Sequence, residues 1–149
     1  MASLKQIEIF LNSGPIAMAG VSRNPKKFGH VAFKELREKG LDLVPVNPSA
    51  AEILGTKAYP DVKSLPPEIS SLLVMTRKDQ TASVVKEAKE KGIRNIWIQQ
   101  SSDTPEAIGE LKGTGINFIT GECIMMFHKP HSFHKFHRGL NRLFGRYPK

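Results

Sequence analysis

The chain has 149 residues, a length that suits one domain with its own hydrophobic core. Its composition, 40% hydrophobic and 24% charged, is ordinary for a globular protein and argues against a disordered or collagen-like chain. The single cysteine, Cys123, excludes an internal disulfide framework and fits a reducing compartment. The opening residues show no secretory signal and no window predicts a membrane span, so we expect a cytoplasmic protein.

The net charge of +8 is concentrated at the C-terminal end. Residues 128–149 carry six basic side chains and no acidic one, so the rest of the chain contributes only +2. A basic segment of this kind suits nucleic acid or another polyanion. A solvated helix face explains the same pattern, and we favour that interpretation.

The first half of the chain alternates strand and helix signals. Ser3 and Gln6 form the pattern of a capping box, which predicts a helix within residues 1–14. The apolar run 16–21 predicts a buried strand, and the helix that follows is expected to end at Gly40.

The second half repeats the alternation. A helix is expected to stop at Gly92, and Thr104 followed by Pro105 predicts the start of another. Besides the first strand, strands are predicted over residues 41–46, 57–59, 71–76, 93–98 and 116–119.

This order of elements predicts an α/β fold with a Rossmann-like, doubly wound and mainly parallel sheet in three α/β/α layers. No repeat or linker divides the chain, so residues 1–149 are expected to form one domain. An apolar stripe over residues 131–145 predicts a C-terminal helix that docks on this domain.

Ligands of such sheets bind beyond the carboxyl ends of the strands. After the first strand, Gly20 and Gly29 stand nine positions apart, and the loop between them carries Arg23, Lys26 and Lys27. A nicotinamide site usually has a tighter glycine pattern there. This longer cationic loop suits a more highly charged phosphate group, although solvent-facing lysines explain it equally well.

The ends of the second and third strands favour the same ligand class. An NAD site usually places an acid after the second strand, whereas this chain has Asn47 and Pro48. The third strand ends in Thr76, Arg77 and Lys78, which adds two cations to the same rim. Basic groups after two strands predict a ligand with several phosphates, such as coenzyme A with its pyrophosphate and 3′-phosphate.

Four segments together carry a family resemblance: GVSRNPKKFGHVAFKELREKG, VPVNPSAAEILGTKAYPDVKSLP, GIRNIWIQ and GINFITGECIMM. In this order they resemble the stand-alone coenzyme A-binding domain proteins, which are similar to the N-terminal domain of the succinyl-CoA synthetase alpha subunit. The chain departs from the family pattern at Thr76-Arg77, where a double proline is common, and at Gln99-Gln100-Ser101, where Gln-Pro-Gly is common.

The resemblance implies a binding site for coenzyme A or an acyl-CoA. It assigns the phosphates to the first loop, the adenosine end to the second strand end, and the adenine or pantetheine path to the third strand end. Together with Arg77, the cation after the third strand, the expected cofactor-binding residues are Gly20, Val21, Ser22, Lys26, Lys27, Val46, Asn47, Pro48, Met75, Thr76 and Gln99.

We find no adjacent nucleophile and base, so no catalytic residue is predicted and binding without catalysis is favoured. Two alternatives stay open: a nicotinamide-dependent oxidoreductase, and a polyanion-binding or nucleic-acid-binding module that uses the basic tail. The histidines that recur every three residues from His128 to His137 do not share one helix face, so no metal site is expected. Cys123 is expected to be a buried thiol. The partner is expected to be a small nucleotide ligand and not a membrane; a nucleic-acid partner is not favoured, and the oligomeric state is not predicted.

Overall fold

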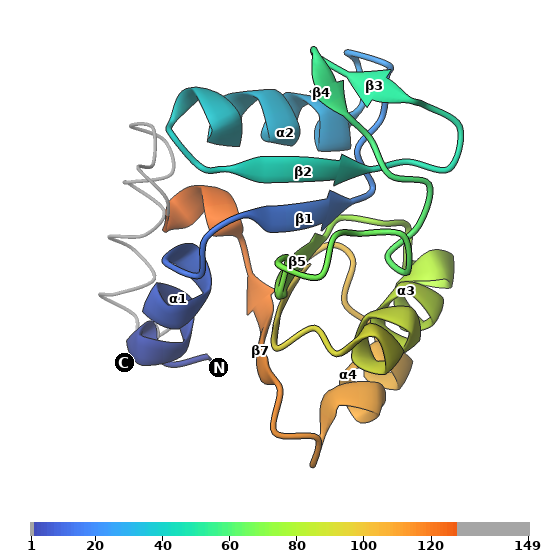
Figure 1. Cartoon of the computed structure of the whole chain (residues 1–149). Coiled ribbons are helices and arrows are strands. Elements are labelled where there is room, and N and C mark those ends of the chain that lie inside the picture. Colours follow the sequence, from blue (N-terminus) through green and yellow to red (C-terminus); the bar gives the residue numbers. More distant parts are fainter. Residues whose placement is uncertain (1, 128–149) are drawn as a thin grey trace.

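A five-stranded parallel sheet forms the centre of the molecule in the computed structural model, which describes residues 2–127. Its strands lie in the order β2-β1-β5-β6-β7 (Figure 1). From β1 the chain adds β2 on one side and then β5, β6 and β7 on the other, so the switch point in strand order lies between β1 and β5. The α/β Rossmann-like fold predicted from the sequence is confirmed. The strands are β1 (Ile16–Ala19), β2 (Leu43–Val46), β5 (Ser71–Val74), β6 (Asn95–Gln99) and β7 (Asn117–Glu122).

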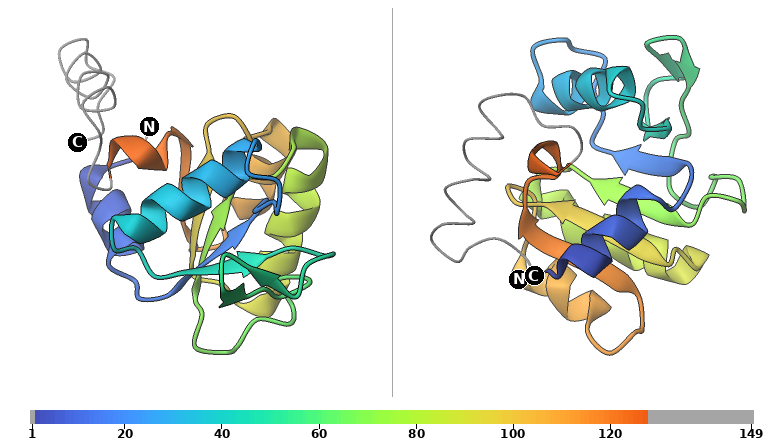
Figure 2. Two further views of the ribbon diagram at one scale, coloured as in Figure 1. Left: turned by 90° about the horizontal axis from the view of Figure 1, so that it is seen from above. Right: turned by 90° about the vertical axis from the view of Figure 1, so that its left-hand side faces the viewer.

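Helices cover both faces of the sheet, as Figures 1 and 2 show. On one face α1 and α2 pack together with a short 3-10 helix, and on the other face α3 packs beside α4. The helices are α1 (Leu4–Leu11), α2 (Phe28–Glu38), α3 (Lys78–Lys91), α4 (Pro105–Leu111) and the 3-10 helix η1 (Ile124–Met126).

The continuous apolar runs of the strands follow from burial on both faces. In β1, Ile16 and Met18 belong to the core under α1 and α2, whereas Ala17 and Ala19 belong to the core under α3 and α4. All four residues are at most 3% exposed. Successive side chains of a strand point to opposite faces, so a two-sided sheet requires an apolar residue at every position.

The helix-boundary signals read from the sequence are confirmed. Ser3 Oγ accepts the Gln6 N–H at 3.2 Å and Gln6 Oε1 accepts the Ser3 N–H at 2.8 Å, which completes the capping box of α1. Gly92 closes α3 in the left-handed conformation, and the Thr104 hydroxyl caps α4 ahead of Pro105.

The segment after β2 differs from the prediction. The strand expected over residues 57–59 is shifted to β4 (Thr56–Lys57), which pairs with an unpredicted strand, β3 (Glu52–Ile53), in a small antiparallel hairpin. Tyr59 instead bridges to the edge of β2: its carbonyl accepts the Asn47 N–H at 2.9 Å and its N–H donates to the Pro45 carbonyl at 3.0 Å. The other strand boundaries agree with the prediction at Ile16, Val46 and Ser71 and elsewhere differ from it by one to three residues.

A chain of polar side chains crosses the sheet at the amino ends of three strands. Ser71 of β5 donates to Ser13 at 2.6 Å and accepts from Asn95 of β6 at 3.1 Å. Asn117 of β7 donates to Asn95 at 3.3 Å and to the Gln6 carbonyl of α1 at 3.1 Å. Polar groups at this edge therefore join the strands to α1, and they lie at the opposite edge of the sheet from the strand ends where a ligand is expected.

The predicted C-terminal helix over 131–145 and the histidine series from His128 lie outside the described residues, so both stay predictions. Within residues 2–127, no helix has the length and apolar character that crossing a membrane requires.

Candidate functional site

A cleft of about 560 Å³ opens at the carboxyl ends of β1, β2 and β5. It lies at the switch point between β1 and β5, the position where doubly wound sheets bind their ligands. We call it the carboxyl-edge cleft. Its lining residues are Ala19, Gly20, Val21, Ser22, Val46, Asn47, Pro48, Pro60, Asp61, Val62, Thr76, Asp79, Gln80, Ser83, Val84 and Glu87.

Two glycines bring three pieces of backbone together at the floor of this cleft. Gly20 follows β1 with a φ of +92°, a conformation that other residues rarely adopt, and a Cβ there would overlap the Met75 carbonyl group. A Cβ on Gly29, in the first turn of α2, would overlap the Gly20 carbonyl oxygen. The start of α2 therefore packs directly against the end of β1 because neither glycine has a side chain.

The loop from residue 20 to residue 27, which we call the β1–α2 loop, is held by side chains from both sides. Asn47, after β2, donates from Nδ2 to the Val21 carbonyl at 2.8 Å, while its Oδ1 accepts the N–H groups of Ser49 and Ala50. His30 Nδ1 lies 2.7 Å from the Ser22 carbonyl oxygen. These contacts fix the path of the loop before any ligand is present.

Local contacts tighten the same loop. Ser22 Oγ accepts the Asn24 N–H at 3.0 Å, and Asn24 Oδ1 accepts the Lys26 N–H at 3.0 Å. Such side-chain turns commonly shape tight loops. The N–H groups of Ser22 and Arg23 have no hydrogen-bond acceptor among residues 2–127. Together with the start of α2, which has no side-chain cap, they offer unused donors to an anion.

The opposite wall of the cleft comes from α3 and from residues 60–62. Val62 and Val84 supply apolar surface, and Val62 is only 1% exposed. The carboxylates of this wall are engaged: Asp61 accepts the Ser64 N–H at 2.8 Å, and Glu87 accepts the Lys63 N–H at 2.9 Å. The Glu87 bond holds the 60–65 segment against α3, and the Asp61 bond fixes a turn within that segment.

The third carboxylate, Asp79, pairs with Arg77 at 2.9 Å, and both side chains are largely exposed. Two other carboxyl groups, both outside the cleft, have shifted pKa values. A hydrogen bond from Lys89 lowers the pKa of Glu110, and burial raises the pKa of Glu122 at the end of β7. Of the pKa shifts resolved within the described part of the chain, neither lies at the carboxyl-edge cleft.

Most of the sequence matches a known protein family. Residues 15–129 match the family described as the CoA binding domain. The chain belongs to this family. The match spans every element of the sheet from β1 to β7 and includes all sixteen residues that line the cleft.

Known proteins similar to this CoA-binding domain are of two kinds. The uncharacterized protein YneT of Bacillus subtilis is 33% identical over 121 residues, which are 81% of this chain and 90% of YneT. The alpha subunit of ADP-forming acetate–CoA ligase II from Pyrococcus furiosus is 36% identical over 93 residues, 62% of this chain but only 20% of that subunit.

A solved structure of a conserved hypothetical protein from Pyrococcus furiosus superimposes with a TM-score of 0.71. It is 35% identical in sequence and the match covers 75% of this chain and 97% of that chain. The CoA-binding domain therefore occurs as a chain of about this size and as a small part of larger ligase subunits.

The structure brings most of the predicted site residues together at one cleft. Seven of the twelve line the carboxyl-edge cleft: Gly20, Val21, Ser22, Val46, Asn47, Pro48 and Thr76. They come from the ends of three strands that are neighbours in the sheet. Contact of each with a ligand stays a prediction.

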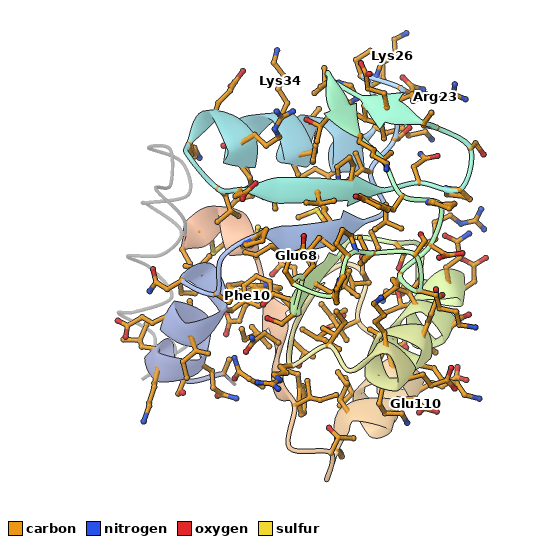
Figure 3. The ribbon with its side chains drawn as sticks, in the orientation of Figure 1. Phe10, Arg23, Lys26, Lys34, Glu68 and Glu110 are labelled. Atoms are coloured by element: carbon orange, nitrogen blue, oxygen red, sulfur yellow. The ribbon has the colours of Figure 1, made fainter. Side chains whose placement is uncertain are left out.

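The other five predicted residues do not line the cleft. Lys26 and Lys27 are exposed on the β1–α2 loop, and Figure 3 shows the Lys26 and Arg23 side chains extending outward from it. Met75 lies beneath Gly20 and packs against the core under α1 and α2. Arg77 stands at the rim, paired with Asp79.

Gln99 is placed differently from the expectation that it faces the crevice. It is 2% exposed, its Nε2 donates to Cys123 Sγ at 3.0 Å, and its Oε1 accepts the Ile124 N–H at 3.1 Å. Both ends of its amide thus hold η1 against β6, which is a structural role. Cys123 itself is buried, as predicted.

One wall of the cleft was not predicted from the strand ends. Asp79, Gln80, Ser83, Val84 and Glu87 lie on one side of α3 at helical spacing. This spacing is visible in the sequence, but only the position of α3 beside the switch point shows that the stripe faces a cleft and not bulk solvent. Residues 60–62 gave no sequence signal because they belong to an irregular segment.

The packing of Gly29 yields a matched test. Gly29→Ala should destabilise the protein by about 1–3 kcal/mol, because the new methyl group has no room beside the Gly20 carbonyl. Gly109→Ala, in α4, meets open space and should stabilise by about 0.5–1 kcal/mol. Urea denaturation of both variants measures the difference. Equal effects of the two substitutions would contradict the close packing at the end of β1.

Proposed function

We propose that this chain binds coenzyme A or an acyl-CoA in the carboxyl-edge cleft. The observation that carries the proposal is the pre-shaped β1–α2 loop, which offers unused N–H donors beside an apolar cleft in a member of the CoA-binding domain family. A phosphate group needs the donors, and the adenosine and pantetheine parts need the apolar walls.

In this proposal, each part of coenzyme A lies against a different part of the carboxyl-edge cleft. The pyrophosphate belongs at Gly20, Val21 and Ser22, where the loop N–H groups and the start of α2 meet. The adenosine end belongs along Val46–Pro48, an open surface next to Val62 and Val84. The pantetheine arm runs toward Thr76, whose hydroxyl lies 3.0 Å from that of Thr81.

The cations of the rim serve the phosphates in this proposal. Lys27 is the N-cap residue of α2, and its carbonyl accepts the N–H groups of His30 and Val31. Its backbone is therefore fixed while its side chain remains free to reach a phosphate. Arg77 is the N-cap residue of α3, and an exposed pair such as Arg77–Asp79 contributes little, so its guanidinium is available to the 3′-phosphate.

We propose binding without catalysis. Two of the cleft carboxylates, Asp61 and Glu87, are hydrogen-bonded to backbone N–H groups, and the Cys123 thiol is buried beside Gln99. In the acetate–CoA ligase relatives the matched region is a small part of the subunit, so we do not assign their reaction to this chain. A free nucleotide ligand and a lone cysteine agree with a cytoplasmic location, and we propose that location together with the function.

The first test is ligand choice. Coenzyme A should raise the melting temperature more than NAD, NADP or ATP, because only coenzyme A combines a pyrophosphate, a 3′-phosphate and a long pantetheine arm. At about a hundredfold over its dissociation constant it should stabilise the fold by about 2.7 kcal/mol. Differential scanning fluorimetry with each ligand measures this, and an equal shift with NAD would refute the proposal.

The second test separates the phosphates. Lys27→Ala should weaken the binding of coenzyme A by about 1.5–3 kcal/mol, the range for a hydrogen bond to a charged group. Lys26→Ala should weaken this binding clearly less. Arg77→Ala should weaken the binding of coenzyme A but hardly affect the binding of dephospho-coenzyme A, which lacks the 3′-phosphate. Isothermal titration of both ligands against the three variants measures these effects.

Lys26→Ala is the matched control, since it removes the same charge one residue away on the same exposed loop. If all three variants lose the same affinity for both ligands, and the loss disappears at high salt, the cations supply only a diffuse field and no defined phosphate contacts.

A further inference from the structure

His30 lies outside the carboxyl-edge cleft but holds the loop that forms its floor. The side chain is only 8% exposed, in the first turn of α2, and its Nδ1 lies 2.7 Å from the Ser22 carbonyl oxygen. A carbonyl oxygen only accepts hydrogen bonds, so the Nδ1 atom must carry the proton. This donor is present in both the neutral and the protonated imidazole.

The bond fixes the direction of a peptide plane. A trans peptide is flat, so the C=O group of Ser22 and the N–H group of Arg23 point in opposite directions. Asn47 does the same one residue earlier: its Nδ2 holds the Val21 carbonyl at 2.8 Å, which sets the direction of the Ser22 N–H. Two successive carbonyl groups of the loop are thus turned toward protein donors, and the two following N–H groups have no acceptor within residues 2–127.

This arrangement suits an anion. A peptide plane that flips exchanges an N–H donor for a carbonyl oxygen, which repels a phosphate. Donors that are already aligned bind a charged ligand without the cost of ordering the loop. Asn47 lines the cleft itself, whereas His30 lines a separate groove behind α2, formed with Pro25, Val31, Lys34, Glu35 and Glu38.

We propose that His30 is a positioning residue of the binding site: it does not touch the ligand, but its Nδ1–H locks the Ser22 carbonyl away from the phosphates and keeps the Arg23 N–H available to them. This inference rests on the proposed function for the identity of the ligand. The geometry of the lock exists in the ligand-free chain and is testable there.

Two substitutions at this position separate the donor from the bulk of the ring. His30→Asn places an amide Nδ2–H close to where the Nδ1–H stands, so it should keep the bond to Ser22. His30→Leu fills similar space without a donor. The backbone order parameters of residues 22–27 from ¹⁵N relaxation should fall in the ligand-free His30→Leu protein and stay near wild-type values in His30→Asn.

Titration with coenzyme A gives the second measurement. The dissociation constant should rise about 3- to 10-fold for His30→Leu, the usual effect of one hydrogen bond, and less than about 2-fold for His30→Asn. A melting curve of each variant shows whether the whole fold has changed. A merely structural histidine would lower the melting temperature of both variants without this difference in loop order.

The outcomes are distinct. Equal loss in both variants, or unchanged loop order in His30→Leu, would overturn the role of the Nδ1–H donor. If wild-type protein fails to bind coenzyme A, the proposed function fails, yet the order parameters still decide whether His30 locks the loop.

Discussion

The contact between the backbones of Gly20 and Gly29 is the constraint on which the proposed binding site depends. The end of β1, the start of α2 and the peptide between Met75 and Thr76 meet where Cβ atoms would overlap with carbonyl groups. Because these backbones touch, the loop between the glycines must fold outward, over the edge of the sheet. Its N–H groups and the start of α2 then stand together at the switch point of the sheet.

Side chains from different elements give this loop its shape in the proposed binding site. Asn47 from the end of β2 and His30 from α2 each take one carbonyl group of the loop. Glu87 of α3 holds the backbone of Lys63 and so positions the opposite wall. The sheet supplies the rigid frame, and a few hydrogen bonds at its carboxyl edge decide which backbone groups face the cleft. At the amino edge, the Ser71–Asn95–Asn117 chain contributes to holding the strands together, at the opposite edge from the carboxyl-edge cleft.

The sequence predicted the fold well because its signals are local. Apolar runs marked the buried strands, and residues such as Ser3, Thr104 and Gly92 marked the helix ends, as the structure confirms. The strand ends also pointed to the edge of the sheet where the carboxyl-edge cleft opens. Strand order is a tertiary property, however, so the sequence alone did not show that one side of α3 faces the cleft.

Two further features could not be predicted from the sequence, because they too depend on tertiary structure. Gln99, the last residue of β6, was expected to face the ligand, but its amide bonds to Cys123 and Ile124 beside a register shift between β6 and β7. His30 looked like an ordinary helix residue, because only the folded loop brings the Ser22 carbonyl within reach of its ring.

The most direct measurement of the central claim is a titration of ¹⁵N-labelled protein with coenzyme A, followed through the backbone amide signals. Binding in the carboxyl-edge cleft should shift the amides of residues 20–29, 46–49 and 76–84 and leave the amino edge around Ser71, Asn95 and Asn117 unchanged. Saturable shifts centred on the amino edge, or shifts confined to residues 128–149, would contradict the account.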